Sequence, residues 1–180
     1  MFPLSNTAAV ATGKRSAAAA RDAATEIQTT LSAFYDAAFM DPRTRKQGLS
    51  PGAWNAFARS IRERARKDAA SLTLGEPASR VDALSITDAS LSVRVLLDPK
   101  GSPDAAIATV VFEASGTLIG GEPVQVSNRA SFLLKPIDGR WLVVGYPQAK
   151  TELEAPSPTP SPSATPTAAG SASPSSGASP

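Results

Sequence analysis

Few side chains in this chain could carry out acid–base or metal chemistry. Its 180 residues include no histidine and no cysteine, which excludes the commonest general base, the commonest transition-metal ligand and all thiolate chemistry. Glu113 lies within a long apolar stretch that predicts a strand, and the alternation leaves open which face it takes. Facing inward and desolvated, it could act as a general base. If it faces outward, Glu113 is a solvent-exposed charge, which is the usual place for an isolated glutamate in a β-strand.

The second chemically capable group is basic. Arg59, Arg62 and Arg66 recur at three- and four-residue steps within one predicted helix. Residues 41–68 hold eight bases and three acids, a local charge of +5, whereas residues 69–154 hold seven bases and ten acids, a charge of −3. A basic helical face can bind anionic lipid head groups, a cell-wall polymer or an acidic protein surface. It can equally be the solvated side of an amphipathic helix.

Nucleic acid is not an expected partner. Proteins that bind single strands interleave basic side chains with exposed aromatic ones, and here Trp54 and Phe57 belong to the apolar stripe of the basic helix. No second acid or oxyanion donor accompanies Glu113 at a readable spacing, so we expect no metal site and no cofactor. The aromatic side chains expected to form the core or line an internal cavity are Phe34, Trp54, Phe57, Phe112, Phe132 and Trp141.

Two amphipathic helices are predicted at the front of the chain. Residues 16–40 carry apolar side chains at three- and four-residue steps, the pattern of a helix with one buried stripe. This helix ends at Asp41-Pro42, since the residue before a proline resists helical dihedrals. Ser50-Pro51 begins a second helix with a serine cap and a proline in the first turn, and that helix is expected to end between residues 70 and 74.

From residue 79 the period of the apolar side chains changes to two, which indicates strands. Short turns separate them, and Asp138-Gly139 is the strongest hairpin signal. Consecutive strands with short turns predict an antiparallel meander. The sequence therefore predicts an α+β fold in which two N-terminal helices pack on a curved antiparallel sheet. The five predicted strands are 79–87, 89–97, 105–119, 124–135 and 140–146.

The two ends of the chain are predicted to be unstructured. Residues 1–15 are expected to be flexible, 16–148 to form the domain, and 149–180 to form a disordered tail. Residues 155–180 consist of Pro, Ser, Ala, Thr and Gly, which offer too little apolar surface to offset the entropy of ordering. Such tails are typical of exported bacterial surface proteins. We expect an extracytoplasmic protein if a signal or anchor precedes Met1, and a cytoplasmic one otherwise.

The segment from Phe132 to Tyr146 reads FLLKPIDGRWLVVGY, with an Asp-Gly hairpin, a tryptophan and then an apolar strand. With two helices before a bent antiparallel sheet, it resembles the nuclear transport factor 2-like, or SnoaL-like, superfamily of cystatin-like cones. Within that superfamily the composition is most similar to actinobacterial extracytoplasmic members. The resemblance covers residues 16–148 and implies a cone with a cavity. It does not imply an activity, because this superfamily includes isomerases, dehydratases, ligand carriers and assembly domains.

These observations favour a non-catalytic extracytoplasmic module for protein interaction or assembly, carrying a flexible tail. Its expected partner is a protein or a component of the cell envelope, with contact to an anionic surface through the second helix as a further option. The oligomeric state is left open. The alternative is a small-molecule-binding protein or a SnoaL-like enzyme that uses the cone cavity, with Glu113 as its base.

Overall fold

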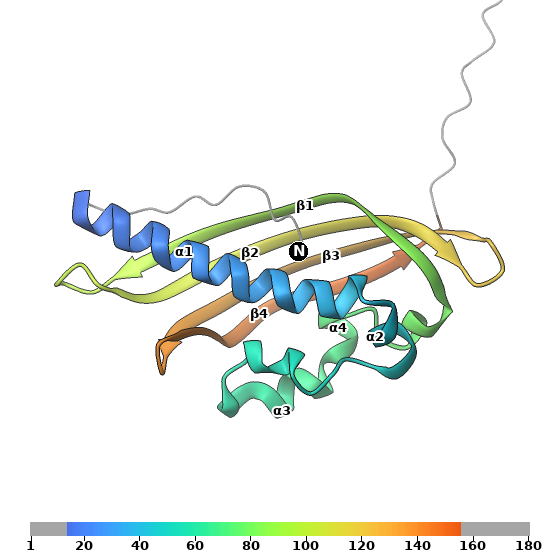
Figure 1. The fold of residues 1–180 in the computed structure, drawn as a ribbon, viewed down its shortest axis with the longest axis horizontal. Helices are drawn as coiled ribbons and strands as arrows, with labels where there is room; N and C mark the ends of the chain where they lie inside the picture. The colour runs from blue at the N-terminus through green and yellow to red at the C-terminus, as the bar shows by residue number, and fades with distance from the viewer. Residues whose placement is uncertain (1–13, 156–180) are drawn as a thin grey trace, which may run out of the picture.

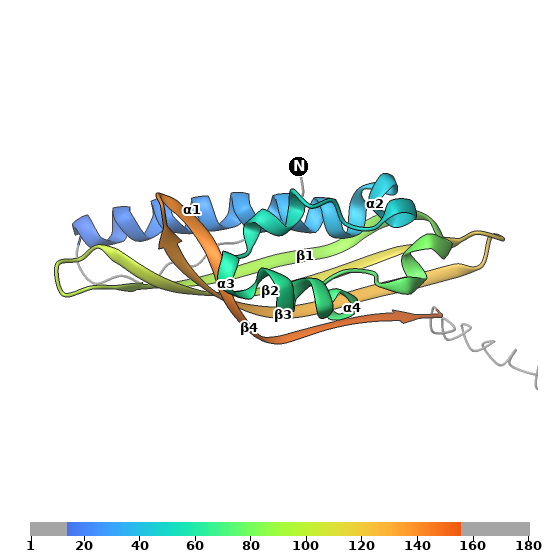
Figure 2. The same cartoon turned by 90° about the horizontal axis from the view of Figure 1, so that it is seen from below.

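The alternating apolar residues after position 80 produce one antiparallel sheet, in which each strand pairs with the next along the chain in the order β1-β2-β3-β4. The computed structural model describes residues 14–155. Of the residues 1–15 that are predicted to be flexible, 1–13 lie outside that range, as does the tail from residue 156, whereas Lys14 and Arg15 are helical. Within it, every helical segment precedes the sheet in sequence, and the helices lie over one side of it (Figure 1; Figure 2). The α+β class and the antiparallel meander are therefore confirmed.

The first predicted helix has nearly its expected bounds, with its last turn widened into a π-helix. The helical elements are α1 (Lys14–Tyr35), the π-helical turn η1 (Asp36–Met40), α2 (Pro42–Gln47), the 3-10 turn η2 (Ala53–Ala56), α3 (Arg59–Lys67), α4 (Ala69–Leu72) and the 3-10 turn η3 (Glu76–Arg80). The strands are β1 (Val81–Leu97), β2 (Pro103–Leu118), β3 (Pro123–Ile137) and β4 (Arg140–Glu154).

The prediction of one continuous second helix is wrong. The chain turns once in η2 and then becomes extended at Phe57, which forms a parallel bridge with Val143 of β4. The Ala58 N–H donates to the Val143 carbonyl at 2.9 Å, so the backbone here satisfies its hydrogen bonds on the edge of the sheet. Helix α3 begins only after that contact. Between the two predicted helices the chain forms a further short helix, α2, because Asp41 accepts a hydrogen bond from the Arg43 N–H at 2.8 Å and caps it.

The prediction of five strands is also wrong, since 79–87 and 89–97 are parts of the single strand β1. A register shift between Ile86 and Asp88 places one extra residue in β1, and such a bulge interrupts the polar–apolar alternation without ending the strand. The predicted start of the tail at residue 149 needs a similar correction. Residues 149–154 continue β4 and pair with β3, from Ala130↔Ala149 to Gln125↔Glu154.

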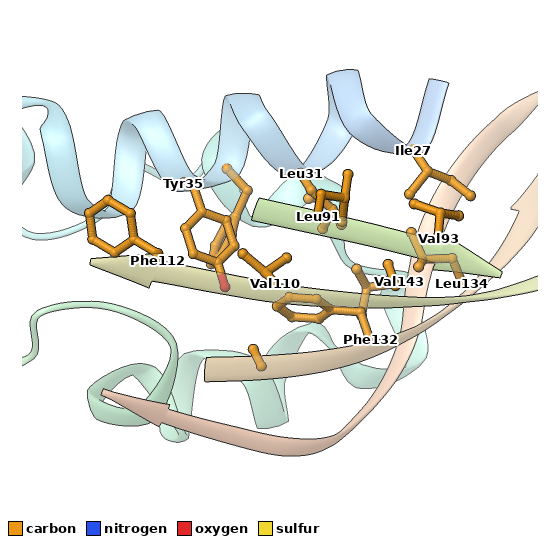
Figure 3. Close-up of a cluster of buried hydrophobic side chains, with 14 of the residues drawn as sticks. Ile27, Leu31, Tyr35, Leu91, Val93, Val110, Phe112, Phe132, Leu134 and Val143 are labelled. Carbon is orange, nitrogen blue, oxygen red and sulfur yellow. The ribbon is translucent and has the colours of Figure 1, made fainter. Parts of the chain in front are cut away.

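The main core lies between α1 and the inner face of the sheet (Figure 3). Ile27 and Leu31 of α1 are fully buried over Leu91 and Val93 of β1, and Phe132 of β3 is equally enclosed. Burying each large side chain stabilises the fold by about 1.5–3 kcal/mol. Alternate residues of every strand contribute to this layer, so the apolar side of the sheet needs a helix along its length.

Strand β4 does not follow β3 evenly. Two register shifts surround Leu133, and β4 bends there, so that the tip of the β3–β4 hairpin turns toward α1 (Figure 2). Trp141, just after the hairpin turn, is consequently buried. Bulges are the usual means by which a strand bends in this way. The bend brings the hairpin tip into the same region as η2 and the beginning of α3.

Gly116 is required by the close approach of β1 and β2. A Cβ atom on Gly116 would lie 2.0 Å from the Ala83 carbonyl oxygen, far inside van der Waals contact, so Gly116→Ala must displace a strand. We expect a loss of about 1–3 kcal/mol of stability, measured as the free energy of unfolding in urea. Gly52→Ala is the matched control, since its Cβ has no neighbour closer than 3.9 Å. Equal unfolding midpoints for the two variants would contradict this interpretation of the strand contact.

Candidate functional site

Glu113 lies on the outer face of the sheet. Its neighbours Phe112 and Ala114 are buried on the inner face, so alternation directs Glu113 away from the helices. Its side chain is 45% exposed, and one carboxylate oxygen is 3.9 Å from Arg129 Nη2. A base that depends on desolvation requires an enclosed position. The structure places Glu113 in solvent contact beside a cation, and the enzyme alternative gains no support from it.

The six aromatic residues expected to form a core or line a cavity are all buried. Phe34 lies at the centre of one group, with its ring centroid 5.1 Å from that of Phe57 and 6.1 Å from that of Trp54. A second group joins Tyr35, Phe39 and Phe112, whose centroids are 4.8 to 6.1 Å apart. These are the distances of packed aromatic pairs. The aromatic side chains therefore fill the space between α1 and the sheet.

A groove of about 440 Å³ lies at the edge of this core, between α1, η2 and the tip of the β3–β4 hairpin. Phe34 and Trp141 lie in its wall, but the groove opens at the surface and is not the internal cavity that the resemblance implies. Most of the other lining groups are small, because Ala33, Ala53 and Ala56 contribute only methyl groups. The groove is thus a shallow site with a largely apolar wall.

A buried polar network, which the sequence analysis did not identify, joins α1 to the edge strand β4 and to α4. The Tyr35 hydroxyl donates to Asn128 Oδ1 at 2.6 Å. The Asn128 amide donates to Thr151 Oγ1 at 2.8 Å and to the Lys150 carbonyl at 3.2 Å. Thr151 in turn donates to the Ser71 carbonyl at 3.0 Å. Asn128 occupies an inward position of β3 whose neighbours on the same face are apolar. A polar residue at such a position could have identified the network from sequence.

This network is structural. Asn128 is 1% exposed, and both ends of its side-chain amide have partners, as a buried amide requires. Burial raises the pKa of the Tyr35 hydroxyl above its ordinary value, so the group stays protonated and keeps its role as donor. The network as a whole links α1 and α4 to β3 and β4.

Removing the Tyr35 hydroxyl tests this assignment. Tyr35→Phe leaves Asn128 Oδ1 buried without its short hydrogen bond, which we expect to cost about 1–3 kcal/mol of stability. The free energy of chemical unfolding measures the loss. Tyr146→Phe is a suitable comparison, because its hydroxyl bonds to a partly exposed carboxylate. A Tyr35→Phe protein as stable as the parent would rule out a stabilising role for the bond.

The three predicted arginines do not share one environment. Arg62 Nη2 donates to the Phe57 carbonyl at 3.0 Å, whereas Arg66 Nη1 lies 3.0 Å from Glu63 Oε1. Arg59 and Arg62 line a cavity of about 600 Å³ to which Arg140 of β4 also contributes, and Arg66 is not among its lining residues. Sequence reasoning missed Arg140, because it follows a hairpin turn 74 residues or more beyond the three predicted arginines.

A further cluster lies between the C-terminal end of α3 and β4. Tyr146 donates to Asp68 Oδ2 at 2.9 Å, and Arg64 Nε is 3.4 Å from the same oxygen. The Arg64 guanidinium also lies 5.5 Å from the centre of the Tyr146 ring, within range of a cation–π contact. Burial, followed by the hydrogen bond to Asp68, raises the pKa of Tyr146 to about 12. The neutral phenol is therefore the form that the folded protein favours.

This raised pKa predicts a change of stability at alkaline pH. Because the pKa of 10.0 expected for an unperturbed tyrosine rises to about 12 on folding, the contribution of Tyr146 is complete below pH 10. It is lost as pH rises through 12. We expect Tyr146→Phe to reduce the fall of the melting temperature between pH 10 and 12. Identical slopes for the parent and the variant would contradict the raised pKa of Tyr146.

Within residues 14–155 the structure has no grouping of three or more acid, histidine or cysteine side chains able to hold a metal ion. No helix in this part of the chain combines the length and apolarity needed to cross a membrane.

Comparison of the chain with protein-family models and with curated protein sequences finds no match.

Proposed function

We propose that this protein is a non-catalytic interaction module that binds a protein partner through the outer face of its sheet. The observation that carries the proposal is a set of large apolar side chains on that face: Leu96 is 48% exposed, Ile107 37% and Leu133 40%. Isolated surface leucines are ordinary, but a contiguous apolar patch is typical of a binding surface.

The patch is continuous across three strands. Ile107 of β2 is directly opposite Leu133 of β3, and directly opposed residues on one face have Cβ atoms about 5 Å apart. Leu96 of β1 pairs with Ala105, two residues from Ile107 on the same side of β2. The helices formed by residues 14–80 lie over the other face of the sheet (Figure 2). The patch therefore faces solvent, at the end of the sheet that carries the β1–β2 and β3–β4 turns.

The charges around the patch indicate the kind of partner. Arg94 and Lys135 are exposed on this face, two residues from Leu96 and Leu133 respectively. Toward the other end of the face, Arg129 pairs with Glu113 and Lys150 pairs with Glu152. A complementary surface thus has apolar side chains at its centre and carboxylates at its rim. Such rim charges chiefly set the rate and specificity of association.

Two finer points belong to this proposal. We relate the fold to the nuclear transport factor 2-like superfamily, on the support of helical segments that precede an antiparallel meander and of the bend in β4. We also propose an extracytoplasmic location if a signal or anchor precedes Met1, on the support of the Pro-, Ser- and Ala-rich composition of residues 155–180. A protein or envelope component reached through a spacer fits both points.

Photo-crosslinking in the producing cells tests the binding face. A photoreactive amino acid at Ile107 should trap a discrete partner, whereas the same group at Ala18, exposed on α1, should not. Arg94→Glu combined with Lys135→Glu should lower the yield from Ile107 roughly tenfold, because both rim charges are reversed. Equal trapping from Ala18, or a yield that charge reversal leaves unchanged, would contradict the proposed face.

A further inference from the structure

Three arginines from two distant segments line one cavity. Arg59 and Arg62 belong to the first turn of α3, and Arg140 begins β4. The cavity encloses about 600 Å³, and its location follows from the backbone. The bridge between Phe57 and Val143 fixes the start of α3 beside β4, three residues from Arg140. The bend in β4 and the interruption of the predicted second helix thus create a basic site.

The charge of this cavity is not neutralised within the described part of the chain. Asp138 is the single acid in the lining, against three arginines. None of the ion pairs found between residues 14 and 155 includes Arg59, Arg62, Arg140 or Asp138. Arg64 and Arg66 of the same helix, in contrast, each have a carboxylate partner. The lining therefore retains a net charge of +2 open to a ligand.

Arg62 is partly fixed and partly unsatisfied. Its Nη2 donates to the Phe57 carbonyl at 3.0 Å, which holds the guanidinium against the wall. Its Nε is buried and has no hydrogen-bond partner in the described residues. A buried guanidinium N–H without an acceptor is costly. Because Nε is closed off from the cavity, a ligand oxygen would meet the charge of the Arg62 guanidinium through the part that lines the cavity. The first turn of α3 also lacks a side-chain cap and an acidic residue, and the beginning of a helix favours an anion.

We propose that this cavity binds the phosphate group of a phosphomonoester. Guanidinium groups match phosphate oxygens in geometry and charge, and the Ser60 and Asn55 side chains in the lining add neutral hydrogen-bonding groups. This site uses residues other than those of the sheet face proposed above, although it borders that face, since Leu142 in its lining is opposite Lys135.

The neighbouring groove indicates what the phosphate is attached to. The cavity and the 440 Å³ groove share Asn55 and Arg140 in their linings, so a ligand can extend from one to the other past these residues. The groove presents Phe34, Trp141 and the methyl group of Ala33. These surfaces accept an apolar or aromatic substituent. The ligand class is thus a phosphomonoester with a compact apolar group.

Titrations with inorganic phosphate and phenyl phosphate at constant ionic strength test the site. Amide signals of Arg59 and Ser60 should shift on saturation, and Arg140→Gln should weaken both ligands about tenfold or more, the effect of losing one charge-assisted hydrogen bond. Arg66→Gln is the matched control, with an expected change below about twofold because Arg66 lies outside the lining. No saturable binding, or equal weakening by the two variants, would overturn the site.

A separate substitution, Ala33→Phe, tests the role of the groove. Phenyl phosphate should bind about tenfold more tightly than inorganic phosphate, because its ring leaves water. Ala33→Phe places a side chain in the groove from an exposed position of α1. It should remove this advantage and leave inorganic phosphate unaffected. Equal affinities for the two ligands in the parent protein would overturn the apolar part of the proposal.

Vesicles containing phosphatidic acid distinguish a lipid head group from a soluble ester. Vesicle binding that Arg140→Gln abolishes and Arg66→Gln preserves supports the site with a lipid as the source of the phosphate. Phenyl phosphate binding without vesicle binding supports it with a soluble ester. Vesicle binding that both variants reduce equally reflects general attraction to basic helix α3 and would overturn the specific site.

Discussion

The packing of α1 against one face of the sheet is the constraint on which the rest of the structure depends. The inner residues of all four strands are apolar and need a cover, and α1 supplies one continuous stripe along them. Aromatic side chains then fill the layer, and the Asn128 amide, a large polar group within it, is satisfied by Tyr35 and Thr151. Because packed side chains fill the interior, we expect ligands and partners to bind at the surfaces around it.

Two irregularities of the backbone form the groove and the basic cavity at the edge of this layer. The register shifts near Leu133 turn the β3–β4 hairpin toward α1, and the bridge at Phe57 interrupts a segment whose pattern is helical. Each places a backbone segment at the edge of the core. Together they bring Arg140 to the start of α3 and form the groove next to Trp141. The uncovered side of the sheet is the consequence of having helices on one face only.

The class and order of the elements could be predicted from sequence because they depend on local period. The stripe in residues 16–40, the alternation after residue 80 and the Asp138-Gly139 turn all carry their own signal. The errors arose where tertiary contacts override that signal. Nothing local shows that Phe57 pairs with Val143, or that a bulge joins two predicted strands into β1. At 149–154 the alternation of Ala149, Thr151 and Leu153 was present but was assigned to the tail.

The candidate sites also combine features that the local sequence predicts with features that depend on tertiary contacts. That Arg59 and Arg62 belong to a basic helix could be predicted, whereas their separation from Arg66 depends on which side of α3 meets β4. The face taken by Glu113 could not be decided locally, because the neighbouring Val111 and Phe112 place apolar side chains on both faces of β2. Arg140 carries no motif. Only the fold places it beside residues that lie far from it in sequence.

The central claim is that the space between α1 and the sheet is filled, so that ligands bind outside it. Crystallography under xenon pressure tests this most directly, since xenon enters apolar voids that water leaves empty. The account predicts no xenon atom within the layer formed by Phe34, Phe112 and Phe132. An ordered xenon atom among these rings would show an internal cavity and contradict the account.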